Sequence, residues 1–257
     1  MNALRQQLNL WWIAVAFFTR IPVPSSVEFS QANLNRASRY FSAVGWLIGL
    51  ICGAVLWVFM LVFPQDVAVL LAMIISLLLT GCFHEDGLAD TCDGLGGGWT
   101  TEQKLRIMKD SRVGTYGAAA LWVSLTLKFV LLSQLLEPVL ALIIAHPLSR
   151  IIPTLFIAVM PYVSDSDTSK AKPLAESGSW VDTAIAVGIG SVALLLVPVG
   201  SGGVGMLLAV LFVVGVLSFL FLKKQLGGFT GDALGAVQQV SELALYLAMI
   251  LIIGSVG

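Results

Sequence analysis

Residues 81–98 read GCFHEDGLADTCDGLGGG, and the rest of the chain is organised around this stretch. It concentrates one histidine and four carboxylates in an otherwise strongly apolar sequence: His84, Glu85, Asp86, Asp90 and Asp93. If the stretch is helical, Asp86, Asp90 and Asp93 fall within about 60° of one another, because their spacing is i, i+4, i+7. Like charges this close repel, and a divalent cation bound by carboxylate oxygens relieves the repulsion. The spacing therefore predicts a metal-dependent active site, with an acidic, solvated loop between membrane helices as the alternative.

The composition is that of an integral membrane protein. Charged residues make up 11% of the chain, against about 25% in a soluble domain, and the mean hydropathy is +0.93. The net charge of -1 argues against a nucleic-acid-binding protein. We therefore predict an all-α, polytopic membrane helix bundle that forms one membrane-embedded domain over residues 1–257.

Seven apolar segments have about the length that a membrane-spanning helix needs. They are residues 41–63, 67–83, 114–136, 139–160, 181–199, 204–222 and 238–254. The apolar core of residues 3–18 is too short to span, and its two tryptophans suit a helix lying at the membrane interface. The predicted bundle thus has about seven transmembrane helices and an N-terminal interfacial helix.

The basic residues indicate how these segments cross the membrane. Twelve of the fourteen lie on connections that share one side of a seven-span arrangement: Arg5, Arg20, Arg36, Arg39, Lys104, Arg106, Lys109, Arg112, Lys170, Lys172, Lys223 and Lys224. By the positive-inside rule that side is cytoplasmic. We expect a multi-pass protein of the bacterial cytoplasmic (inner) membrane, with the acidic stretch and the basic loops inside, the N-terminus inside and the C-terminus outside.

The other two basic residues, Lys128 and Arg150, lie within predicted spans. An unpaired cation in hydrocarbon is costly, so such residues usually face a polar cavity and mark function, unless they snorkel towards an interface. Lys128 is near mid-span, where snorkelling is difficult. We expect both residues to contact substrate, with Lys128 facing inwards; Glu242 is one of the few acids within its reach.

Two further loops carry residues suited to phosphate. Lys109 and Arg112 follow the acidic stretch one helical turn apart, and both side chains are good partners for phosphate oxygens. Near the end of the chain, Thr230-Gly231-Asp232 opens a helix after two glycines. Such a start is capped by a threonine or aspartate side chain and also favours an anion.

Clustered carboxylates, cations and a glycine-rich helix start together favour phosphoryl or phosphonucleotidyl transfer on a pyrophosphate-containing substrate. A carboxylate or His84 could deprotonate the acceptor hydroxyl. His84 can join the Asp86 face only if the helix starts near Asp86. Zinc binding by Cys82, His84 and Cys92 is the less favoured metal site, because their spacing matches no zinc motif.

Four motifs in order resemble the cobalamin synthase (adenosylcobinamide-GDP ribazoletransferase) family: FFTRIPVP, FHEDGLADTCDGL, MKDSRVGTYG and LGGFTGD. The resemblance runs from about Phe17 to Glu242. It implies transfer of the adenosylcobinamide phosphate group from adenosylcobinamide-GDP to α-ribazole or its 5′-phosphate, with release of GMP and a requirement for Mg²⁺.

The resemblance, together with the residue chemistry, gives a set of candidate site residues. The metal-binding candidates are Asp86, Asp90 and Asp93, which with His84 are also the catalytic candidates. The substrate-binding candidates are Arg20, Lys109, Arg112, Lys128, Arg150, Thr230 and Asp232. The expected partners are the two substrates and the lipid bilayer; homo-oligomers and association with other nucleotide-loop assembly enzymes are left open.

Two other classes of membrane protein share some of these features. CDP-alcohol phosphotransferases also carry aspartates on membrane helices, but Asp90 stands where their D-G-x-x-A-R signature has arginine. An ion-coupled secondary transporter would place its acidic sites near the midplane of repeated halves. Here the acidic stretch lies at one membrane face and has no counterpart in the second half of the chain.

Overall fold

The computed structural model describes residues 3–163, 177–197 and 200–254. In these ranges every regular element is a helix, apart from an isolated parallel bridge between Tyr162 and Phe229. The all-α prediction is confirmed. In chain order the elements are α1 (Ala3–Phe18), α2 (Gln31–Ala37), η1 (Ser38–Tyr40), α3 (Phe41–Met60), α4 (Gln65–Thr80), α5 (Phe83–Gly97), α6 (Thr101–Met108), α7 (Thr115–Gln134), α8 (Pro138–Leu148), α9 (Ile151–Val159), α10 (Trp180–Ser191), η2 (Val192–Leu196), α11 (Gly200–Leu226) and α12 (Gly231–Ile253).

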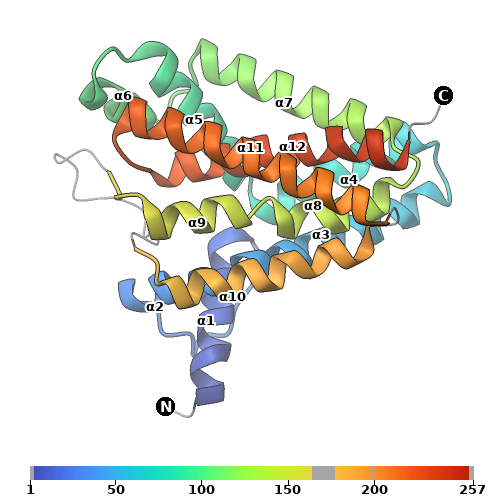
Figure 1. Ribbon diagram of the computed structural model, residues 1–257, viewed down its shortest axis with the longest axis horizontal. Helices are drawn as coiled ribbons and strands as arrows, with labels where there is room; N and C mark the ends of the chain where they lie inside the picture. The colour runs from blue at the N-terminus through green and yellow to red at the C-terminus, as the bar shows by residue number, and fades with distance from the viewer. Residues whose placement is uncertain (1–2, 164–176, 198–199, 255–257) are drawn as a thin grey trace.

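Most of the longer helices run along one common direction, and α1 projects away from them (Figure 1). The second half of α1 is held in the core by Leu10, Ile13 and Phe18, whereas Leu4 and Leu8 near its start are exposed. A helix whose first half projects from the bundle with exposed leucines fits the predicted interfacial helix. Its position relative to a bilayer stays a prediction.

The structure confirms a polytopic helix bundle but not the count of seven spans. Among the described residues, five helices are long and apolar enough to cross a membrane, and a bent pair makes a sixth if it counts as one span. The predicted segment 181–199 is represented by the shorter apolar helix Trp180–Leu196, and its last two residues lie outside the described ranges. Lys170 and Lys172, which entered the charge pattern, also lie outside them.

The bent pair consists of α4 and α5, which meet at 84°. Gly81 and Cys82 both adopt left-handed backbone conformations there, with φ of 63° and 58°. This conformation is accessible to glycine but strained for cysteine. The predicted segment 67–83 therefore continues as a helix in a new direction, and after the bend the acidic stretch packs against α6, α7 and α12.

Close helix packing positions α8 against α3. Gly45, Gly49 and Gly53 follow one another at intervals of four residues and form a stripe on α3. A Cβ atom on Gly45 would lie 2.6 Å from the backbone oxygen of His146, and one on Gly49 would lie 2.9 Å from that of Leu142. Small residues at this spacing let membrane helices approach closely. The stripe thereby fixes α8 and the polar residues at its end.

Candidate active site

The acidic stretch forms α5, which packs against α6, α7 and α12. Its contact with α12 is close, because a Cβ atom on Gly87 would lie 2.8 Å from the backbone oxygen of Asp232. Gly87 therefore allows the first turn of α12 to pack beside Asp86 and Asp90. Gly87 and Asp232, which are 145 residues apart in the sequence, meet at this point.

The three predicted metal-binding aspartates occupy different environments along α5. Asp86 is exposed, Asp90 is partly buried and Asp93 is buried. We call Asp86 and Asp90 the acidic face. Asp93 does not share their access to solvent, so the three carboxylates are not equivalent.

Asp93 already has partners in the protein. Its two carboxylate oxygens accept hydrogen bonds from the backbone N–H groups of Gly114, at 2.7 Å, and Gly117, at 2.9 Å. Gly114 is the N-cap residue of α7 and has no side chain with which to cap it. Asp93 of α5 therefore caps the N-terminus of α7. This role is usually filled by a side chain at the start of the capped helix itself. A Cβ atom on either glycine would clash with this carboxylate.

The expected three-aspartate metal site is not preformed. Within the described ranges, no group of three or more histidine, cysteine, aspartate or glutamate side chains is placed to hold one ion. Mg²⁺ is commonly bound by one or two protein carboxylates together with substrate phosphates. The acidic face fits that mode of binding, whereas both oxygens of Asp93 already accept a hydrogen bond from the backbone.

His84 lies apart from the acidic face. The helix begins at Phe83, before His84, and not near Asp86 as the shared site required. The imidazole is buried and stacks on the ring of Phe18 with centroids 5.4 Å apart and the planes 6° from parallel. The predicted role of His84 as the base at the aspartates does not agree with this position.

The start of α12 agrees with the prediction from Thr230-Gly231-Asp232. Thr230 is the N-cap residue, and its hydroxyl oxygen accepts a hydrogen bond of 3.0 Å from the backbone N–H of Ala233. Asp232 lies in the first turn and is partly buried. The helix begins seven residues earlier than the apolar segment 238–254 suggested, which brings its N-terminus to α5.

The other predicted cations lie at the rim of this region. Lys109 is the exposed C-cap residue of α6. Arg112 is exposed and forms a two-bond pair with Asp110, with Nη2–Oδ2 at 2.6 Å and Nε–Oδ1 at 3.1 Å. These bonds hold the pKa of the Asp110 carboxyl below its usual value. Arg20 lies at the α4–α5 bend, where its guanidinium packs over Gly81.

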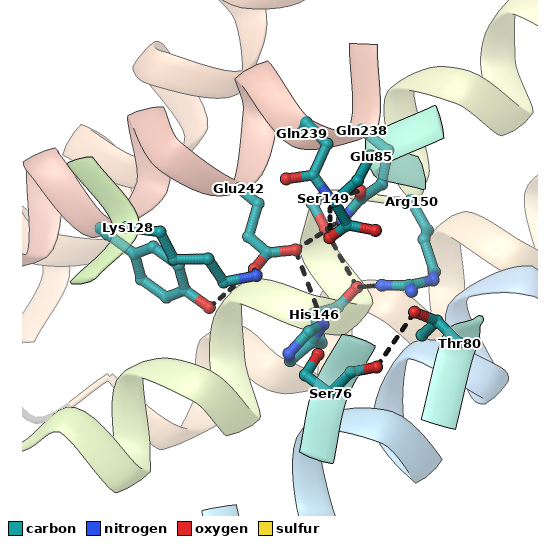
Figure 2. Close-up of polar contacts among 11 residues, drawn as sticks. Ser76, Thr80, Glu85, Lys128, His146, Ser149, Arg150, Gln238, Gln239 and Glu242 are labelled. Atoms are coloured by element: carbon teal, nitrogen blue, oxygen red, sulfur yellow. Dashed lines mark hydrogen bonds and ion pairs between the residues drawn. The ribbon is translucent and has the colours of Figure 1, made fainter. Parts of the chain in front are cut away.

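A second group of polar side chains lies inside the bundle, and Figure 2 shows most of it. We call it the buried cluster. It comprises Glu85, Lys128, His146, Ser149, Arg150, Gln238, Gln239, Glu242 and Tyr246, all of which are buried.

Glu242 on α12 is the centre of the buried cluster. Its carboxylate forms an ion pair with Lys128 of α7 at 2.5 Å and accepts hydrogen bonds from Gln238 at 2.6 Å and Tyr246 at 3.0 Å. Lys128 therefore faces inwards, as predicted, and does not snorkel. Its partner is a carboxylate of the protein, and this pairing gives Lys128 a role in holding α7 to α12.

Hydrogen bonds continue from Glu242 to α5. Gln238 also donates to Ser149 at 3.0 Å, and Gln239 donates to Gln238 at 3.1 Å and to Glu85 at 3.1 Å. Gln238, Gln239 and Tyr246 are not among the site residues predicted from the sequence. The signal was present, since Gln238, Glu242 and Tyr246 recur every four residues in an otherwise apolar helix.

Comparison with known proteins shows the family to which the chain belongs. A family model described as Cobalamin-5-phosphate synthase matches residues 10–250. The chain belongs to this family. It is 50% identical over 252 residues to the adenosylcobinamide-GDP ribazoletransferase of Shewanella frigidimarina, covering 95% of both chains. It is 50% identical to that of Shewanella pealeana over 98% of both, and 48% identical to that of Vibrio parahaemolyticus over 96% of this chain and 94% of the relative. No solved structure matches.

The resemblance to the cobalamin synthase family is thus confirmed over nearly the whole chain. The matched region contains α5, α7, the start of α12 and the buried cluster. In this member of the Cobalamin-5-phosphate synthase family, Gly87, between Asp86 and Asp90, packs on the capped start of α12. Asp86 is open to solvent, whereas the side chains of the buried cluster are covered by the protein, and two of them, Arg150 and Gln238, also line a pocket.

Proposed function

We propose that the chain transfers the adenosylcobinamide phosphate group from adenosylcobinamide-GDP to α-ribazole or its 5′-phosphate. The observation that carries this proposal is the similarity, along 95% or more of the chain, to relatives named adenosylcobinamide-GDP ribazoletransferase. A hydroxyl oxygen of the acceptor forms a new bond to the phosphorus that carries the corrinoid group. The diphosphate P–O bond breaks, and GMP leaves with the bonding electrons. The hydroxyl proton passes to a carboxylate or to water.

The acidic face is the proposed place of this reaction. Mg²⁺ bound by Asp86 and Asp90 would neutralise charge on the diphosphate oxygens. The N–H groups in the first turn of α12 favour an anion at the adjacent position. Lys109, Arg112 and Arg20 are proposed to attract the phosphates from the rim. Asp93 holds the loop before α7 in place beside these groups and does not bind the metal directly.

A reconstituted transfer assay tests the proposed reaction. Protein purified in detergent is mixed with Mg²⁺, adenosylcobinamide-GDP and α-ribazole, and GMP and cobalamin are measured by chromatography. We expect the two products in equal amounts, and none when α-ribazole is omitted. Absence of GMP from well-folded protein, or GMP formed without cobalamin, would contradict the transfer.

We further propose that the protein lies in the cytoplasmic membrane with α5, the loop before α7 and the start of α12 inside. The one-sided distribution of basic residues supports this orientation. A cysteine introduced beside Trp99, which is exposed after α5, should resist a membrane-impermeant thiol reagent in intact cells and react in inverted vesicles. Labelling in intact cells would reverse the orientation.

A further inference from the structure

A pocket lies at the point where the end of α1, the start of α5, α9 and the first turns of α12 meet. It has a volume of about 400 Å³, including the part that is open to solvent. Gly231 belongs to its lining, so the pocket adjoins the capped N-terminus of α12, and the next residue, Asp232, packs on Gly87 between Asp86 and Asp90. A ligand in this pocket would therefore lie next to the helix start that borders the proposed place of reaction.

The walls of the pocket are mainly apolar, and several are flat rings. The lining side chains include Phe18, Phe83, Ile157 and Leu234. The rings of Phe18 and Phe83 meet edge to face with centroids 5.5 Å apart. Small-molecule sites that are apolar and aromatic, with few polar groups, suit planar and weakly polar ligands.

Two polar atoms of the lining residues have no hydrogen-bond partner within the described part of the chain. They are Nε2 of His84 and Nε of Arg150. The residues are 4% and 2% exposed, and the Arg150 guanidinium lies over the Phe18 ring at 5.7 Å. Its Nη1 donates to the backbone oxygen of His146 at 2.7 Å, which fixes the orientation of the group. Buried polar groups are rarely left unsatisfied, and a ligand seated in the pocket would offer these two atoms a partner.

We propose that this pocket binds the benzimidazole base of α-ribazole, an inference that rests on the proposed function. The base is a flat, apolar bicycle whose ring nitrogen can accept a hydrogen bond from Nε–H of Arg150. Guanine and the corrinoid amides carry many donors and acceptors, which these apolar walls would leave unpaired. Binding the base here directs the ribose towards the acidic face, where its hydroxyl meets the diphosphate.

A pair of matched substitutions tests the assignment. Ile157→Phe adds a ring inside the pocket, and Leu142→Phe makes a similar addition in a different cavity, beside Lys128. Both original side chains are 3% exposed. We expect Ile157→Phe to raise the KM for α-ribazole about tenfold or more, with the KM for adenosylcobinamide-GDP within about twofold, because one or two methylene-sized changes in a pocket have effects of this size. Leu142→Phe should leave the ratio of the two KM values unchanged.

A second variant covers the case in which Ile157→Phe does not fold. Ile157→Ala enlarges the pocket, and the measured quantity is the ratio of kcat/KM for a riboside of a larger tricyclic base to that for α-ribazole. This ratio does not depend on how much protein is active. We expect it to rise about tenfold. An unchanged ratio, or a rise in both KM values together, would overturn the assignment. Absence of any transfer by the unmodified protein would instead contradict the proposed function.

Discussion

The acidic face and the buried cluster both contain carboxylates in an apolar chain, but their surroundings are opposite. Glu242 in the buried cluster receives an ion pair and two hydrogen bonds from the protein itself. Asp86 on the acidic face is exposed, one turn of helix before Asp90. A carboxylate that is paired within the protein can hold the helices together, whereas an exposed carboxylate such as Asp86 can take a ligand. Glu242 therefore has a structural role, and Asp86 is available for chemistry.

The largest expected effect is on turnover when the acidic face is changed. Asp86→Ala should lower kcat by about a hundredfold to ten-thousandfold, because it removes a ligand that neutralises phosphate charge. Thermal stability in detergent should stay within a few degrees of the unmodified protein. The matched control is Glu102→Ala, which removes an exposed carboxylate from α6. Near-normal turnover of Asp86→Ala would remove the acidic face from the reaction.

Breaking the buried ion pair should mainly affect stability. Glu242→Leu leaves Lys128 charged and unpaired, and breaking a buried pair in this way costs about 3–5 kcal/mol. Lys128→Met alone should also destabilise, since it leaves the carboxylate without its cation. The double variant should recover much of the loss in the melting temperature. If the single variants melt normally but do not turn over, the buried cluster takes part in the reaction and the comparison fails.

Asp93 lies on the same helix as the acidic face but, like Glu242, has its partners inside the protein. Its substitution therefore tests whether it has a structural role. Asp93→Ala leaves the N–H groups of Gly114 and Gly117 without acceptors, which costs about 1–3 kcal/mol. Asp93→Asn keeps one acceptor oxygen and should lose less. The melting temperatures should therefore rank the unmodified protein, the asparagine variant and the alanine variant in that order. Equal stability of all three would show that the carboxylate has no structural role.

The smallest expected effect concerns the cap of α12. Thr230→Ala removes the hydroxyl that accepts from Ala233 and should cost about 1 kcal/mol. Thr230→Ser keeps the hydroxyl and serves as the control, with stability close to that of threonine. A loss of turnover in both variants, without loss of stability, would indicate that the threonine methyl group contacts substrate.

Local patterns predicted much of the fold. The apolar segments became helices, Thr230 became an N-cap, and mid-span Lys128 turned inwards to one of the few acids within its reach, Glu242. These features depend on hydropathy, capping chemistry and the cost of an unpaired buried charge, all of which the sequence contains.

Features set by tertiary contacts could not be predicted in the same way. Asp93 shares the helical spacing of Asp86, and only the packing of α5 against α7 brings it to the backbone of Gly114 and Gly117. Hydropathy continues through residues 67–83, so it does not reveal the bend at Gly81. The position of His84 depends on where the helix starts and on its stacking against the ring of Phe18. The residues next to His84 in the sequence predict neither feature.

The dependence of the rate on Mg²⁺ tests the central claim most directly, because it separates Asp86 from Asp93 in one experiment. The concentration of Mg²⁺ that gives half the maximal rate is measured for Asp86→Asn and Asp93→Asn at high enzyme concentration. We predict an increase of about tenfold or more for Asp86→Asn, since a carboxylate ligand is lost, and a value close to that of the unmodified protein for Asp93→Asn. A large increase for Asp93→Asn with none for Asp86→Asn would contradict the account.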